Sequence, residues 1–150
     1  MTHSQKNICR IGNFSGFWGD DPEALKRQLS GGALDYANGD YLAEVSMSIL
    51  SKQLEKNPEG GYVTDFIDHV NLALYEIHAS KTRIISNAGG CNPIGCAQKL
   101  QEVFLEHGIE KKVVAITGDN IFPGIDELQD KGETFTNSET GESFQDIRQQ

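Results

Sequence analysis

Four acidic side chains lie at points where a polar loop is expected to follow an apolar stretch of the chain. They are Asp20, Asp40, Glu44 and Asp119. Carboxylates in such loops serve as general acids and bases or as ligands of divalent cations. Four of them at one edge would repel a bare phosphate, so the expected partner is a divalent cation or a ligand rich in hydrogen-bond donors. The alternative is that these carboxylates are solvated or accept hydrogen bonds from neighbouring loop amides.

Glycines, amides and one aromatic side chain accompany these acids and favour ligand binding at the same loops. Glycine lets the backbone approach a ligand closely, and the free N–H groups of a helix that begins after Asn92 attract an anion. Simple helix capping is the alternative role of Asn92, and plugging of the sheet edge is that of Trp18. The predicted ligand-binding residues are Gly16, Trp18, Gly19, Asn87, Gly89, Gly90 and Asn92.

Several enzyme signatures are excluded by their spacing. The glycines from Gly12 to Gly19 read G-x-x-x-G-x-x-G, which is not the dinucleotide-binding G-x-G-x-x-G pattern. The sequence contains no phosphate-binding P-loop, no H-E-x-x-H motif and no G-x-S-x-G nucleophile motif. Cys91 and Cys96 have no second pair to complete a structural zinc site. The sequence therefore names no reaction type, and a catalytic role and a role in binding alone both stay open.

Short apolar stretches alternate with helical patterns, which predicts an α/β fold. The expected strands, all parallel, are Ile8–Gly12, Arg83–Asn87 and Lys112–Thr117. Helical periodicity or capping signals predict helices between and after them, at Asp21–Gly31, Leu42–Leu54, Val63–Ile77 and Asn92–Gly108. This alternation favours a mostly parallel, Rossmann-like sheet with helices on both faces.

The carboxyl ends of parallel strands meet at one edge of a sheet, and ligands bind outside that edge. Four loops are therefore predicted to gather there: Gly16–Asp21, Gly39–Glu44, Asn87–Asn92 and Gly118–Asn120. Asp40 and Glu44 would lie one helical turn apart if a helix began near Asp40.

Composition limits the classes of partner. The chain has 150 residues, with 13 basic and 22 acidic side chains and a net charge of −9, which argues against nucleic acid and anionic membranes. A small-molecule ligand is expected, with no particular cofactor beyond the divalent cation considered above. Three cysteines without a framework spacing, and no long apolar segment, predict a cytoplasmic protein. We expect an α/β domain over residues 1–130 and an underpacked or truncated tail over residues 131–150.

Four motifs in order along the chain resemble the acyclic terpene utilisation (AtuA) family. The resemblance extends from Cys9 to about Thr140. The motifs are Ser15–Pro22 (S-G-F-W-G-D-D-P), Asp35–Leu50 (D-Y-A-N-G-D-Y-L-A-E-V-S-M-S-I-L), Ser86–Ala97 (S-N-A-G-G-C-N-P-I-G-C-A) and Thr117-Gly118-Asp119. The candidate acids and the residues of the Asn87–Asn92 loop match the family pattern, except Cys91, where an aliphatic residue is expected.

The resemblance implies a role in the catabolism of acyclic terpenoids such as citronellol and geraniol. It implies that the chain acts on or binds a branched terpenoid acid or its coenzyme A ester at the carboxyl edge of the sheet. A non-catalytic module that binds a ligand or partner is the alternative, as is an inactive fragment. Family chains are several times longer, so the resemblance implies an N-terminal portion, which would expose apolar surface or form a homo-oligomer.

Overall fold

The computed structural model describes residues 8–148. Residues 1–7 and 149–150, parts of the predicted domain and of the predicted tail, lie outside the described residues. The chain forms two compact units, the first extending to Ile116 and the second beginning at Thr117. This division lies upstream of the domain boundary predicted after residue 130. Each unit is described by itself below.

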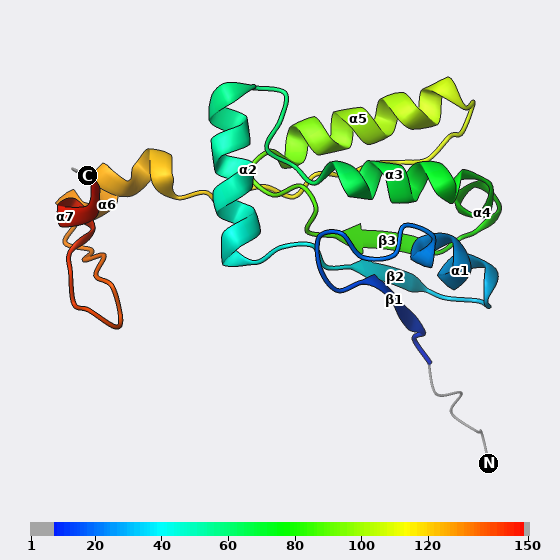
Figure 1. The fold of residues 1–150 in the computed structure, drawn as a ribbon, viewed down its shortest axis with the longest axis horizontal. Coiled ribbons are helices and arrows are strands. Elements are labelled where there is room, and N and C mark those ends of the chain that lie inside the picture. The colour runs from blue at the N-terminus through cyan, green and yellow to red at the C-terminus, as the bar shows by residue number, and fades with distance from the viewer. Residues whose placement is uncertain (1–7, 149–150) are drawn as a thin grey trace, which may run out of the picture. The chain divides into compact units, whose positions relative to one another are not determined.

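The first unit contains a three-stranded parallel sheet. Its strands are β1 (Ile11–Ser15), β2 (Tyr36–Gly39) and β3 (Arg83–Ser86), and they lie side by side in that order (Figure 1). The predicted α/β fold with a parallel sheet is therefore confirmed. The strand predicted at Arg83–Asn87 is confirmed as β3, and the one predicted at Ile8–Gly12 lies three residues further along, as β1.

The central strand, β2, was not predicted. Its sequence Tyr-Ala-Asn-Gly has little β propensity, because Asn and Gly are depleted in strands. The strand forms because its neighbours pair with it on both sides and because its inward positions are small. A side chain at Gly39 would overlap the ring of Phe14. Packing in the folded state, rather than local preference, therefore determines this strand.

Five helices belong to the first unit: α1 (Ala24–Ser30), α2 (Glu44–Lys56), α3 (Thr64–Leu72), α4 (Leu74–Ala79) and α5 (Pro93–Glu106). The capping predictions for α5 are confirmed, since Asn92 caps it and Gly108 follows it with a φ of 65°. The single helix predicted over Val63–Ile77 is wrong. It is broken at Ala73, whose N–H bonds the carbonyl three residues earlier, at Val70. The apolar spacing continues through this break and so does not reveal it.

The helices that pack on the sheet lie on one of its faces. α1 contacts β1 and β2 and also packs against α3 and α4, while α3 packs against α5. Phe14 and Ala37 are buried on this side, whereas Ile11, Asn38 and Ile85 on the other side are exposed. Coverage of both faces, as predicted, is not found within residues 8–148. Right-handed crossovers that step in the same direction along a sheet place their helices on the same face.

The strand predicted at Lys112–Thr117 is not formed. Val113 packs partly against the core, but Val114 and Ile116 are largely exposed, and the segment pairs with no strand in the described part of the chain. High β propensity does not make a strand without a neighbour to pair with and a layer to cover its side chains. The prediction of a third strand at this place was therefore wrong.

The second unit is small. It contains a 3₁₀ turn, η1 (Phe122–Gly124), and the helices α6 (Ile125–Asp130) and α7 (Phe144–Arg148). Thr136 and Ser143 form one antiparallel bridge, and the rings of Phe135 and Phe144 meet edge to face at 6.4 Å. Across both units, no helix among the described residues is long and apolar enough to cross a membrane.

Candidate functional site

The ends of two neighbouring strands bring Asp40 and Asn87 together. β2 and β3 are in register at Gly39 and Ser86, so the residues that follow them meet at the carboxyl edge of the sheet. The side-chain amide of Asn87 donates to Oδ1 of Asp40 at 2.7 Å, and its Oδ1 accepts a hydrogen bond from the backbone N–H of Tyr41 at 2.9 Å. Both side chains are exposed to solvent. We call these two residues the Asp40–Asn87 pair.

The end of β1 is tied to this pair through Ser15. The backbone N–H of Asp40 donates to the carbonyl oxygen of Ser15 at 2.9 Å. In return, the buried hydroxyl of Ser15 shares its hydrogen bond between the carbonyl oxygens of Asp40 and Phe17, each 3.2 Å away. The backbone beneath the pair is therefore fixed by all three strands, while one carboxylate oxygen of Asp40, Oδ2, accepts no hydrogen bond from any described residue.

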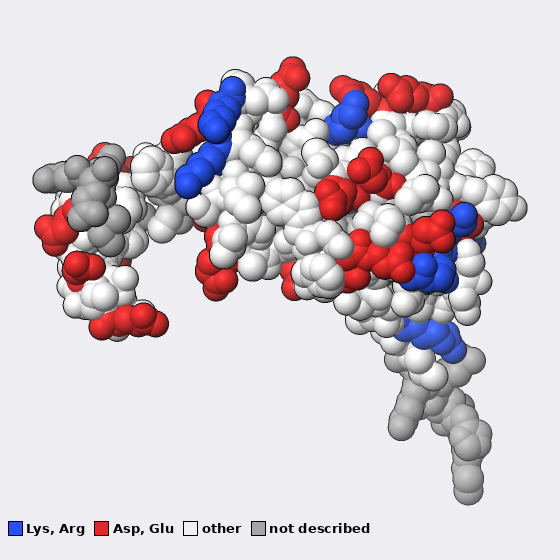
Figure 2. Space-filling view, viewed as in Figure 1, with Lys and Arg blue, Asp and Glu red and all other residues white. Residues whose placement is uncertain are grey.

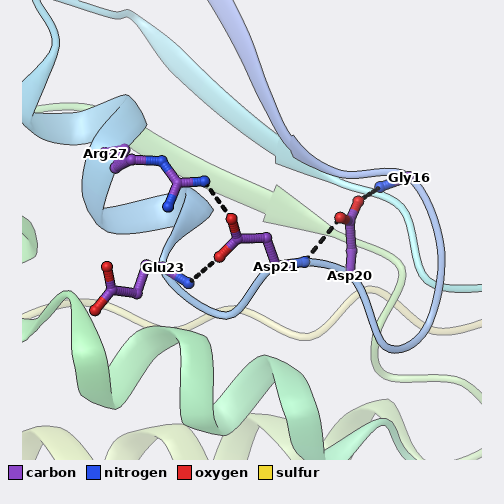
Figure 3. A network of polar contacts seen from close by, with 5 residues as sticks. All are labelled: Gly16, Asp20, Asp21, Glu23 and Arg27. Atoms are coloured by element: carbon purple, nitrogen blue, oxygen red, sulfur yellow. Dashed lines mark hydrogen bonds and ion pairs between the residues drawn. The ribbon is translucent and has the colours of Figure 1, made fainter.

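The carboxylate of Asp20 is engaged by backbone groups of its own loop. Its two carboxylate oxygens accept hydrogen bonds from the backbone N–H groups of Gly16, at 2.9 Å, and Asp21, at 2.7 Å (Figure 3). These two hydrogen bonds, the one from Gly16 above all, hold the pKa of Asp20 below its usual value. Asp20 therefore closes the loop after β1 as an acceptor that is ionised at neutral pH, which is the alternative that the sequence left open.

The next residue, Asp21, connects this loop to α1. It accepts hydrogen bonds from the backbone N–H of Glu23 at 2.9 Å and from the guanidinium of Arg27 at 2.5 Å (Figure 3). The hydrogen bond from Arg27, followed by that from Glu23, lowers the pKa of Asp21. α1 begins at Ala24 with Glu23 as its cap, so the helix start predicted with Asp21 as cap is wrong by two residues, because a turn intervenes.

Trp18 is held by a hydrogen bond rather than left free as the wall of a pocket. Its indole N–H donates to Oδ1 of Asp65 at 3.0 Å, and its ring packs against the core. Gly19 adopts a φ of 94° in open space, and Gly16 is exposed and bonded to Asp20. In this loop, Phe17 is the large apolar side chain that faces solvent, with 60% of its surface exposed.

The loop after β3 is fixed by its packing against the turn that precedes α3. Asn92 accepts a hydrogen bond from the N–H of Gly95 and donates to the carbonyl oxygen of Gly60, both at 2.9 Å. A side-chain carbon at Gly90 would come within 2.5 Å of Leu50, and one at Gly89 within 2.8 Å of Pro93. Close packing is thus enough to explain why glycine and asparagine occupy these three positions.

Glu44 and Asp119 are not brought to the pair by any described contact. α2 begins at Glu44, with Ala43 as its cap, so Asp40 precedes the helix and the predicted one-turn spacing within it is wrong. Glu44 is exposed on the first turn of α2. Asp119 belongs to the second unit. The loop Gly118–Asn120 was predicted to share the edge because a strand was expected before it, and that strand is not formed.

The acidic side chains of the first unit lie in several separate groups on the face shown in Figure 2. Within residues 8–148, no three His, Cys, Asp or Glu side chains gather closely enough to hold a metal ion.

The sequence did not reveal a buried polar pair beneath the site. The hydroxyl of Tyr41 lies 2.7 Å from Nδ1 of His69, and each residue exposes only 1% of its surface. Burial raises the pKa of Tyr41 and lowers that of His69. The available signal was the spacing in α3, where His69 shares the buried face of the helix with Phe66 and Val70.

The three parallel strands and the helices between them place the chain among the α/β proteins with a parallel sheet. The sequence model described as acyclic terpene utilisation family protein AtuA matches residues 9–150. Because this match covers nearly the whole chain, the chain belongs to the acyclic terpene utilisation family, and the resemblance found in its motifs is confirmed. Searches of the curated proteins and of the solved structures found no match.

Proposed function

We propose that this chain serves acyclic terpene utilisation by binding the coenzyme A ester of a branched terpenoid acid at the carboxyl edge of its sheet. Membership of the acyclic terpene utilisation family supports the first part of this proposal, the role in terpene utilisation. The observation that carries the proposed site is the Asp40–Asn87 pair, whose exposed carboxylate keeps Oδ2 available to a ligand. Parallel sheets bind ligands at this edge.

The charge of Asp40 favours the ester over the free acid. A carboxylate oxygen accepts hydrogen bonds and donates none, so it repels another carboxylate and attracts N–H groups. The pantetheine arm of a coenzyme A ester carries amide N–H groups, and its thioester carbonyl is uncharged. The isoprenoid chain of the ligand has apolar neighbours at the same edge, since Phe17 follows β1 and Val45, with 71% of its surface exposed, lies on the first turn of α2.

The test uses a neutral probe, the geranoyl thioester of N-acetylcysteamine, which keeps one amide N–H and lacks phosphates. Trp18, the only tryptophan, reports binding by its fluorescence, with calorimetry as a second measurement. Asp40→Asn should weaken binding about 10- to 100-fold, the effect of losing a hydrogen bond to a charged group. Glu55→Gln, which neutralises an exposed acid on α2, is the matched control and should bind as the original chain does.

If Asp40→Asn binds the thioester as tightly as the original chain does, the Asp40–Asn87 pair is not part of the binding site. Geranic acid should bind more weakly than the thioester, and the reverse order would contradict the role given to the carboxylate. Glu44→Gln and Asp119→Asn belong in the same titration, because these two acids remain proposed ligand contacts that rest on their sequence positions.

A further inference from the structure

Tyr41 connects the exposed Asp40–Asn87 pair to the buried core. Its backbone N–H donates to Oδ1 of Asn87, and the residue before it carries the Asp40 carboxylate. Its side chain runs inward, and the hydroxyl lies 2.7 Å from Nδ1 of His69 on α3. We propose that Tyr41 and His69 are positioning residues, whose buried hydrogen bond holds the Asp40–Asn87 pair in its binding geometry. This inference rests on the proposed function of that pair.

The side chain of Tyr41 has little freedom to move once this hydrogen bond is made. Its ring centroid lies 5.8 Å from that of Phe66 and 5.7 Å from that of His69, and the ring of Phe14 meets it edge to face at 6.4 Å. A tyrosine ring rotates about two side-chain bonds, and packing together with a hydrogen bond at its far end fixes both. Because the side chain of Tyr41 is fixed, its backbone N–H is also held in place, and this N–H bonds Asn87 at the exposed edge of the sheet.

The proton in this hydrogen bond belongs to Tyr41. Burial raises the pKa of the tyrosine, so its hydroxyl stays protonated and donates. Burial also lowers the pKa of His69 below 6.5, so the imidazole is neutral near pH 7, with Nδ1 as acceptor and the proton on Nε2. Protonation of His69 would turn Nδ1 into a donor facing another donor. The hydrogen bond would then have to be remade with its direction reversed.

Charged carboxylates on two segments, and the buried thiol of Cys96 on a third, lie around His69 and Tyr41; burial raises the pKa of that thiol to about 11 and keeps it neutral. Asp65 and Asp68 on α3, and Asp20 and Asp21 on the loop after β1, favour the protonated imidazole, although the burial of the ring outweighs them. On α5, Cys96 faces Tyr41. Protonation of His69 would therefore change the position of the Asp40–Asn87 pair through Tyr41, although His69 itself contacts no ligand.

Two variants separate the hydrogen bond from the bulk of the ring. His69→Leu removes the acceptor, whereas His69→Asn keeps an acceptor atom at the position of Nδ1 and cannot be protonated. The readout is hydrogen exchange of the Tyr41 amide, which donates to Asn87, compared with the amide of Leu100 inside α5 as a reporter of global unfolding. His69→Leu should lower the protection of the Tyr41 amide about tenfold relative to Leu100, and His69→Asn should restore it.

Leu100→Ala is the matched control. It opens a cavity in the core at α5 and should lower the protection of both amides together. If His69→Leu is unfolded, Tyr41→Phe removes the same hydrogen bond with a smaller change of shape and replaces it in the comparison. Equal loss of protection at Tyr41 and Leu100 in these variants would overturn the inference, because it would show a purely structural role.

A pH series supplies the second readout. As pH falls through the lowered pKa of His69, relative protection of the Tyr41 amide should decline in the original chain and stay level in His69→Asn. Affinity for the geranoyl thioester should follow the same pattern. If the thioester binds neither chain, the proposed function fails, while the exchange measurements still decide on Tyr41 and His69. Identical pH profiles for the original chain and His69→Asn would overturn the inference.

Discussion

Two aspartates on successive loops show how local hydrogen bonds decide what a carboxylate can do. Both oxygens of Asp20 accept backbone N–H groups of its own loop, so the charge is used to hold that loop closed. Asp40 accepts from the amide of Asn87 and, at 3.3 Å, from the N–H of Leu42, both through Oδ1, so Oδ2 accepts no hydrogen bond from the described residues. The same residue type therefore holds one loop closed and, in the function proposed above, presents a binding group in the next.

The role of Asp20 predicts a pH-dependent loss of stability. Its pKa in the folded chain lies below the ordinary value of 3.8, chiefly because of the hydrogen bond from Gly16. Its contribution is therefore present above pH 3.8 and is lost as pH falls through the lower folded value. Asp20→Ala should lower the melting temperature clearly at pH 7 and much less at an acid pH where Asp20 is protonated in the folded chain as well. Thermal unfolding at both pH values, with Glu23→Ala as control, measures this. An equal decrease at both would exclude the ionised carboxylate as the cause.

At the scale of elements, the loop after β3 is held against the turn before α3 by contacts that leave no room for side chains. Gly90 has a φ of 50°, and its missing side chain would meet Leu50 and the carbonyl oxygen of Gly61. The N–H of Cys91 donates to that same carbonyl at 2.9 Å, and the N–H of Val63 donates to Ala88 at 2.8 Å. These contacts join the loop after β3 to the segment that leads into α3.

Gly90→Ala should therefore be strongly destabilising. A left-handed conformation costs a non-glycine residue about 1–2 kcal/mol, and the overlap with Leu50 adds to that cost, so a loss of roughly 2–4 kcal/mol is expected. Gly16→Ala is the matched control, because its added carbon would meet only Asp20, at 3.9 Å. Urea unfolding of both variants provides the comparison. Similar losses in the two would contradict the packing explanation.

Asn92 predicts a graded series at the start of α5. Asn92→Ala loses the cap of the helix and the hydrogen bond to Gly60, and should cost about 1–2 kcal/mol. Asn92→Asp keeps the capping oxygen and loses the donor to Gly60, so its stability should fall between those of the original chain and the alanine variant. The free energy of unfolding of the three chains tests this order. If Asn92→Ala is as stable as the original chain, the Asn92 cap makes no measurable contribution to the free energy of unfolding.

At the scale of the whole molecule, the outward face of the sheet mixes apolar and polar side chains. Ile11 and Ile85 expose 67% and 53% of their surfaces. Between them, the amide of Asn38 donates to the side chain of Asn13 at 3.1 Å, and the guanidinium of Arg83 lies 5.7 Å from the centre of the Tyr36 ring. Parallel sheets ordinarily carry cover on both faces.

This exposure predicts that the isolated chain binds a hydrophobic dye or self-associates. Ile11→Thr with Ile85→Thr should reduce dye fluorescence or the apparent mass in solution, and leave the melting temperature within a few degrees, because exposed positions contribute little to stability. Dye binding and light scattering measure both properties. A compact monomer without dye binding would contradict the expectation before any variant is made.

Local sequence signals were sufficient to predict those elements whose ends are marked by residues typical of helix or strand boundaries. Pro93 and Gly108 mark the two ends of α5, and the apolar run Arg83–Ser86 marks β3. β2 could not be predicted, because Gly39 is explained only by the ring of Phe14 and Asn38 only by its hydrogen bond to Asn13. The segment Lys112–Thr117 failed for the opposite reason, since its strand propensity is high and it lacks a partner. In the candidate site, the meeting of Asp40 with Asn87 followed from the two loops sharing one edge, whereas the link from Tyr41 to His69 depends on how α3 packs against Tyr41 beyond the end of β2.

The strand order β1-β2-β3 affects how the chain can fold while it is being translated. Each later strand pairs with one that was translated before it, so no strand has to be inserted afterwards between two others. Tyr36 pairs with Arg83, which is translated 47 residues afterwards, or roughly 2–9 seconds later at bacterial to eukaryotic rates of about 5–20 residues per second. By then the segments of β1, α1 and β2 have all been translated and are available to pair and pack. The nascent chain can thus assemble its sheet from the N-terminus onward while translation continues.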